Sequence, residues 1–113
     1  MPAVLITCAC PDREVADALA LALVEARLAA CVQILPGMTS TYRWEGAIER
    51  SAEVLLLAKT WDDRVDALTA TLQARHPYAL PGIMAFPAAG GLAAYLDWVR
   101  VETRPDGADE TLA

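Results

Sequence analysis

The segment Cys31–Gly46, CVQILPGMTSTYRWEG, predicts a long β-strand that runs into a hairpin turn at Glu45-Gly46. Its first half is an apolar run that contains β-branched residues, and side chains then alternate between two faces after Pro36-Gly37. Met38, Tyr42 and Trp44 share one of these faces. Proline removes a ladder donor and glycine permits a bulge, so Pro36-Gly37 predicts a bend within the strand.

The returning strand, Ile48–Lys59, is equally long. At ~3.3 Å per residue the two strands could project some tens of ångströms from the body of the domain. An exposed strand edge of that length is prone to aggregation unless another chain covers it. The hairpin therefore predicts an obligate oligomer.

Upstream of the hairpin, Ala3–Cys8 predicts a short strand, and Pro11-Asp12 opens a helix that extends to about Ala29. Downstream, Thr60–Asp63 resembles a capping box that opens a second helix. That helix must end near Arg75, because the residue before Pro77 disfavours helical backbone angles.

Two further elements complete the chain. Ile83–Phe86 lies between prolines, which is typical of an edge strand. Leu92, Tyr95, Leu96 and Val99 mark an additional C-terminal helix. Beyond Thr103 the composition becomes rich in proline, glycine and acidic residues, so we expect one domain over residues 1–103 and a disordered acidic tail over residues 104–113.

The order strand, helix, strand, strand, helix, strand indicates an α+β fold, the ferredoxin-like split βαβ sandwich. Its antiparallel sheet would have the strand order 4-1-3-2, with both connecting helices on one face. The other face would carry apolar side chains without cover. Self-association is the simplest way to bury such a face.

Composition narrows the possible partners and the compartment. The chain has 113 residues, is 56% hydrophobic and carries a formal net charge of −6, which argues against nucleic acid and anionic membranes as partners. No apolar run approaches the roughly 18 residues of a membrane span, and the N-terminus lacks the features of a signal peptide. Three cysteines, of which Cys8 and Cys10 point to the same side of one strand, favour free thiols in a reducing, cytoplasmic environment.

Topology draws attention to Cys8 and His76. If the first strand ends near Cys8, the second helix must return to the same edge of the sheet and end near His76. A thiolate and an imidazole are suitable ligands for copper. The alternative is that Cys8 is a small buried hydrophobe and that His76 caps the end of a helix.

A second candidate site combines large aromatic residues with a lysine. The set could line a pocket for a small anion or metabolite; it comprises Trp44, Glu45, Lys59, Tyr78 and Trp98. Alternatively the aromatic residues pack at a subunit interface while Lys59 extends to water. A pocket that joins Lys59 to Cys8 and His76 would require a neighbouring subunit.

Seven short blocks resemble, in order and spacing, those of the CutA divalent-ion tolerance family. They are Cys8–Asp12, Leu28–Val32, Pro36–Ser40, Tyr42–Gly46, Glu53–Thr60, His76–Tyr78 and Tyr95–Trp98. The resemblance implies a ferredoxin-like homotrimer whose sheets face inward and whose hairpins clasp neighbours, similar to the PII signalling proteins. It also implies a role in tolerance of copper and other divalent metals, no established catalytic activity, and copper ligands at Cys8 and His76.

The chain departs from the pattern of this family at positions that could supply ligands. Ala79 and Gly82 stand where family members usually carry acidic or polar residues, and Arg75 stands where some relatives have a histidine. These departures predict weak metal binding, because oxygen and nitrogen donors have been removed.

The sequence therefore predicts a non-catalytic, cytoplasmic homotrimer that binds copper or another divalent cation weakly at Cys8 and His76. There is a single histidine and no phosphate-binding loop, nucleophile elbow or Cys-x-x-Cys pair, which argues against an enzyme. The alternative is a PII-like signalling module that senses a small metabolite at clefts between subunits and acts through an unknown protein partner.

Overall fold

The computed structural model describes residues 2–105 and has the predicted α+β architecture. One four-stranded sheet has the order β2-β3-β1-β4, and all three strand pairs are antiparallel. This confirms the predicted ferredoxin-like order 4-1-3-2. The elements are β1 (Ala3–Cys10), α1 (Arg13–Glu25), β2 (Cys31–Trp44), β3 (Ala47–Trp61), a 3₁₀ turn (Asp62–Arg64), α2 (Val65–Arg75), β4 (Ile83–Pro87) and α3 (Ala93–Glu102).

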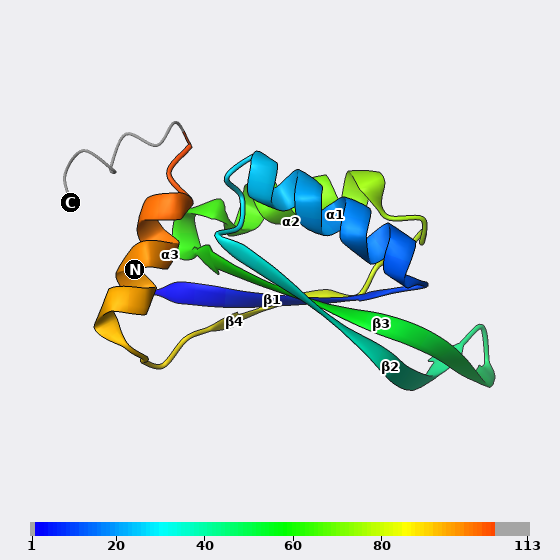
Figure 1. The fold of residues 1–113 in the computed structure, drawn as a ribbon. Coiled ribbons are helices and arrows are strands. Elements are labelled where there is room, and N and C mark those ends of the chain that lie inside the picture. Colours follow the sequence, from blue (N-terminus) through cyan, green and yellow to red (C-terminus); the bar gives the residue numbers. More distant parts are fainter. Residues whose placement is uncertain (1, 106–113) are drawn as a thin grey trace.

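The core lies between the sheet and the two helices α1 and α2, which cover one face of it (Figure 1). Every second residue from Val4 to Cys10 in β1 and from Val54 to Thr60 in β3 points toward the helices, and the register places Cys8 opposite Leu56. Helical spacing brings leucines of both helices onto the same layer. The side chains of this layer are almost fully buried; they include Ile6, Cys8, Leu19, Leu23, Leu56, Leu68 and Leu72.

The hairpin of β2 and β3 extends past the helices and makes the molecule 52 Å long by 26 Å and 22 Å across (Figure 1). The predicted turn is confirmed, because Glu45 and Gly46 have positive φ angles of 49° and 82°. The predicted bend is confirmed as a register shift between Leu35 and Met38, with Gly37 at a φ of 82°. All residues from 41 to 50 are exposed, so its own chain leaves the tip of the hairpin largely uncovered.

The first helix ends at Glu25, which is earlier than the predicted end near Ala29. Arg27 adopts a left-handed φ of 56°, and the amides of Leu28 and Ala29 both donate to the carbonyl of Leu23. This backbone reversal closes the helix in the way that a glycine usually does. The sequence carries no glycine there, so the stop had no local signal.

The predicted capping box at Thr60 was wrong. Thr60 belongs to β3, is fully buried, and donates its hydroxyl to the carbonyl of Leu28 at 2.6 Å. The 3₁₀ turn that follows has no side-chain cap. The Thr60 hydroxyl, which the sequence pattern assigned to a helix N-terminus, therefore makes a tertiary hydrogen bond instead.

The C-terminal helix α3 contacts β1 and β3 at the end of the sheet opposite the hairpin (Figure 1). Arg104, the first residue of the predicted tail, donates to both carboxylate oxygens of Asp63 at 2.7 and 2.8 Å. Residues 106–113 of that predicted tail lie outside the described part of the chain. Within the described part, no helix has the length and apolar character needed to cross a membrane.

Candidate metal site and aromatic cavity

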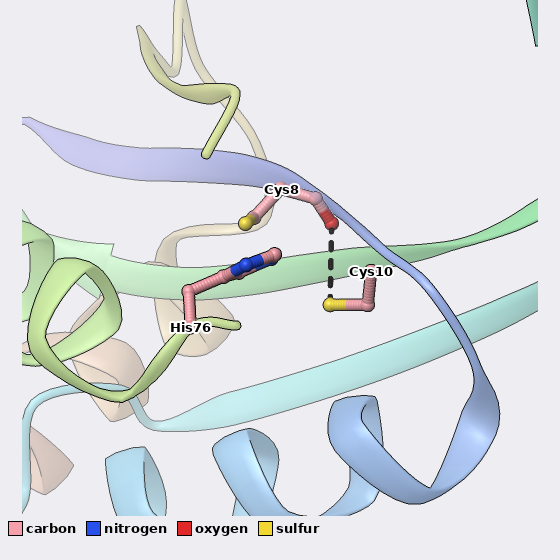
Figure 2. Close-up of side chains that lie close together, drawn as sticks. All are labelled: Cys8, Cys10 and His76. Atoms are coloured by element: carbon pink, nitrogen blue, oxygen red, sulfur yellow. Dashed lines mark hydrogen bonds between the residues drawn. The ribbon is translucent and has the colours of Figure 1, made fainter. Parts of the chain in front are cut away.

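Three potential metal ligands converge under the helices. The Sγ atoms of Cys8 and Cys10 and a ring nitrogen of His76 all lie within 4.8 Å of one another. Figure 2 shows the imidazole pointing toward β1 and the two sulfur atoms. The structure thus brings together Cys8 and His76, which the sequence analysis paired, and adds Cys10. The period of two along a strand was the signal for Cys10.

Both nitrogens of His76 are already engaged. Nδ1 lies 3.1 Å from the backbone nitrogen of Tyr78, whose N–H can only donate, so Nδ1 is the acceptor. Nε2 must then carry the proton and donates to the carbonyl of Ala9 at 2.9 Å. The imidazole is neutral and holds the chain that follows α2 against β1. A metal ion could use His76 only by displacing one of these hydrogen bonds.

The two thiols are fully buried and influence each other. Cys10 Sγ lies 3.9 Å from the carbonyl oxygen of Cys8, to which it donates (Figure 2). A hydrogen bond to the Cys10 thiol raises the pKa of Cys8, and burial and the nearby charges of Cys10 and Glu53 raise it further. Because a thiolate is the form that binds metals, a metal must displace the Cys8 proton.

The donor set fits a soft or borderline cation in its chemistry. Two sulfur atoms and one imidazole suit Cu(I) or Zn²⁺, whereas Mg²⁺ and Ca²⁺ require oxygen ligands. The fit has a cost, because His76 must release a backbone group and Cys8 must release a proton. The geometry therefore favours weak rather than tight binding.

The second set of predicted residues separates into two places. Trp44 and Tyr78 line a cavity of about 660 Å³ that runs from the base of the hairpin toward its turn. Lys59 and Trp98 lie near the other end of the sheet, where Lys59 Nζ is 5.8 Å from the ring centre of Tyr95 and Tyr95 stacks on Trp98. The described part of one chain therefore forms no pocket that combines all five predicted residues.

Glu45 occupies the left-handed turn beside Trp44, and it does not line the cavity. Ala79 and Gly82, two of the departures from the family pattern, do line it. A Cβ added at Gly82 would meet no atom within 4 Å, so the wall has room for a side chain at this position.

The cavity contains one charged residue that the sequence analysis did not propose. Glu53 is only 9% exposed, and its Oε2 accepts the hydroxyl of Tyr78 at 2.8 Å. Burial, together with the hydrogen bond to Glu53, raises the pKa of Tyr78. The sequence feature that could have pointed to Glu53 is its position immediately before the apolar run that starts at Val54. Tyr42 also lines the cavity, and its hydroxyl is paired with that of Ser51 at 2.8 Å.

Residues 4–102 match the family described as CutA1 divalent ion tolerance protein. The chain is 51% identical over 100 residues to the divalent-cation tolerance protein CutA of Thermus thermophilus, covering 88% of this chain and 95% of that protein. It is 46% identical over 94 residues to human protein CutA, covering 83% of this chain and only about half, 52%, of the human protein.

A crystal structure of CutA from Xylella fastidiosa superposes with a TM-score of 0.89 at 44% identity. The match covers 92% of this chain and all of the other. The family description and the name of the Thermus relative denote tolerance of divalent cations and no catalysed reaction.

Proposed function

This chain belongs to the CutA1 divalent ion tolerance family, and we propose that it acts in tolerance of copper or another divalent cation as a non-catalytic, cytoplasmic homotrimer. The observation that carries the proposal is the convergence of Cys8, Cys10 and His76 within 4.8 Å. These residues would hold the cation through two thiolates and one imidazole nitrogen.

Weak binding is part of the proposal. The imidazole must give up its contact with Ala9 or with Tyr78, and two buried thiols must lose protons. A protein with such a site would take up the cation when its free concentration rises and release it when the concentration falls. A permanently loaded site would need donors that are free before the metal arrives.

Competition against a chelator tests the metal site, with Cu(I) under anaerobic conditions and with Zn²⁺. We expect Cys8→Ala and Cys10→Ala to weaken binding by at least about tenfold, as loss of a ligand should. Alanine keeps the apolar character of these buried positions, so the fold should survive. Cys31→Ala is the matched control, since Cys31 is only partly buried and lies outside the cluster. If all three variants bind the metal with equal affinity, Cys8 and Cys10 are not its ligands and the proposed metal site is wrong.

The trimer is supported by two uncovered surfaces. The sheet face opposite α1 and α2 exposes large apolar side chains, with Leu35 58% and Met84 59% exposed, and the hairpin tip is exposed along its whole length. An apolar face of this kind is typical of an interface. In a trimer the three sheets would cover one another, and the hairpins would reach neighbouring subunits.

Sedimentation equilibrium tests the assembly, and Leu35→Glu should weaken it by placing a charge in the interface. Leu21→Glu is a close control, because Leu21 is 61% exposed on the outer side of α1, which packs on the sheet with its other face. A wild-type protein that stays a folded monomer at micromolar concentration would contradict the proposal, as would equal effects of the two substitutions.

A second candidate function is small-molecule sensing at clefts between subunits, acting through a protein partner. What favours it is the cavity of about 660 Å³, which falls in the usual size range of ligand pockets. Thermal shift separates the two candidates, because ligands raise the melting temperature of the state that they bind. Cations that act at the thiols should lose their effect in Cys8→Ala, whereas a ligand of the cavity should keep it.

A further inference from the structure

Tyr78 is tied to the imidazole of His76 through its backbone and to the carboxylate of Glu53 through its hydroxyl. The N–H of Tyr78 donates to Nδ1 of His76 at 3.1 Å, and the two rings lie 4.7 Å apart, centre to centre. The hydroxyl donates to Oε2 of Glu53 at 2.8 Å. Glu53 precedes the core residue Val54 in β3, so its side chain lies on the sheet face opposite the helices. Tyr78 therefore links the buried thiol and imidazole cluster to the other face of the sheet.

The tautomer of His76 decides what happens to this link when the imidazole becomes a ligand. A neutral imidazole has one nitrogen with a free lone pair and one with a proton. In His76 the lone pair is on Nδ1, which accepts from Tyr78, and the proton is on Nε2, which donates to Ala9. If Nδ1 binds a cation, its lone pair is lost to the Tyr78 amide. If Nε2 binds a cation, the proton moves to Nδ1, which then faces the Tyr78 N–H as a second donor. In both cases the amide of Tyr78 loses its acceptor.

Tyr78 must move because His76 is fixed by its own backbone. The amide of His76 donates to the carbonyl of Leu72 at 2.9 Å and so belongs to the last turn of α2. The carbonyl of Ala9 favours ligation through Nδ1. Cys8 donates its thiol to this carbonyl at 3.7 Å, and a Cys8 thiolate could not, so the Nε2–H of His76 is then the donor that Ala9 needs. Metal-ligating histidines commonly donate their other N–H to such a carbonyl.

We infer that Tyr78 is a positioning residue that couples occupancy of the metal site to Glu53 on the opposite face of the sheet. The inference rests on the metal function proposed above and adds regulation to the same site. When His76 ligates a cation, the amide of Tyr78 leaves Nδ1 and draws the hydroxyl away from Glu53. Because coupling between two sites is reciprocal, the Tyr78–Glu53 hydrogen bond in turn opposes uptake of the cation. In the proposed trimer this sheet face meets neighbouring subunits, so the state of the cluster reaches the interface.

Nuclear magnetic resonance of the intact protein during titration with Zn²⁺ tests the first part of the link. Zn²⁺ has no redox chemistry, and His76 is the only histidine in the chain, so its ring nitrogens need no further assignment. We expect the Nδ1 resonance to move and the hydrogen-exchange rate of the Tyr78 amide to rise at least about fivefold. The amide of His76, bonded to Leu72 within α2, is the internal control and should keep its rate, because only Tyr78 is released.

Two matched variants test the second part of the link by competition with a chelator for Zn²⁺. Tyr78→Phe removes the hydroxyl that binds Glu53, and we expect it to bind Zn²⁺ at least about threefold more tightly although it is less stable. The reason is that the metal-free state loses a hydrogen bond that the metal-bound state does not make. Tyr42→Phe removes the same atom from the pair with Ser51 and should leave the affinity unchanged. A merely structural role of the Tyr78 hydroxyl would not raise the affinity.

The outcomes separate the inference from the function on which it rests. If Zn²⁺ does not bind, or binds equally well in Cys8→Ala, both are overturned. If Zn²⁺ binds through the cysteines but leaves the ring of His76 and the amide of Tyr78 unchanged, the inference alone is overturned. Unchanged or weaker binding in Tyr78→Phe overturns the coupling to Glu53. Should Tyr78→Phe not fold, the Cζ resonance of Tyr78 in the wild-type protein decides, because a hydroxyl that stays on Glu53 leaves this resonance unmoved.

Discussion

The thiol and imidazole cluster and the aromatic cavity lie on either side of the same residue, Ala9. The carbonyl of Ala9 accepts the Nε2–H of His76 under the helices, while Ala9 also lines the cavity at the hairpin base. In the cluster every ligand atom is buried and the ring nitrogens are paired within the chain. In the cavity the aromatic side chains remain partly exposed. Side chains that are paired and buried within the chain thus adjoin side chains that the same chain leaves partly exposed.

The cavity itself contains two tyrosine hydroxyl pairs of equal length and different burial. Tyr78 donates to Glu53 at 2.8 Å in a partly buried setting, and Tyr42 pairs with Ser51 at 2.8 Å in an exposed one. Distance alone would rank them as equal. Burial should decide how much each hydrogen bond contributes to the free energy of unfolding, because water replaces a lost partner only where water has access.

The largest effect is expected from His76→Ala. This change leaves the amide of Tyr78 without its partner, leaves the carbonyl of Ala9 with only the weak thiol donor of Cys8 at 3.7 Å, and opens a hole beside the thiols. We expect the free energy of unfolding to fall by about 2–4 kcal/mol. Arg75→Ala, at the adjacent exposed position, should change it by less than about 0.5 kcal/mol. Denaturant titration gives both values, and similar losses would contradict a structural role for His76.

Tyr78→Phe should have an intermediate effect, about 1–2 kcal/mol at neutral pH, because Glu53 stays buried without its donor. The matched change Tyr42→Phe, at the exposed pair with Ser51, should lower the free energy of unfolding by less. Unfolding followed by denaturant titration compares the two. Equal losses of stability would mean that burial does not distinguish the two hydroxyl pairs.

The same tyrosine predicts a dependence on alkaline pH. Burial and the hydrogen bond to Glu53 raise the pKa of Tyr78 in the folded state. The unfolded chain therefore loses this proton first, from about pH 10, and stability should fall as pH rises above that value. The loss of stability with rising pH should be smaller in Tyr78→Phe. Both proteins contain Cys8, so the difference between their two pH profiles is free of the contribution of Cys8. Parallel pH profiles would exclude this assignment.

The smallest effect is expected from Ser51→Ala, which removes the hydroxyl partner of Tyr42 on the hairpin. Water can replace an exposed partner, so we expect a change in unfolding free energy of at most about 0.5 kcal/mol. Thermal melting at a fixed protein concentration measures it. A loss as large as that of Tyr78→Phe would show that the hairpin is covered in solution, and would therefore sharpen the case for the trimer.

Much of the fold was predictable because it depends on local patterns. The alternation after Pro36-Gly37, the turn at Glu45-Gly46 and the end of the second helix before Pro77 are each set by a few adjacent residues. The errors arose where a distant partner decided. Thr60 bonds a carbonyl 32 positions away in the chain, and the first helix ends at a left-handed arginine.

The sequence by itself determined the antiparallel sheet, the long hairpin, and the meeting of Cys8 with His76 at one edge. These follow from strand order, side-chain period and helix length. Only the tertiary structure decided that both nitrogens of His76 are occupied, that Lys59 and Trp98 lie away from Trp44, and that Glu53 is the buried charge of the cavity. The physical reason is that burial and hydrogen-bond partners depend on segments far apart in the chain, which a local pattern does not encode.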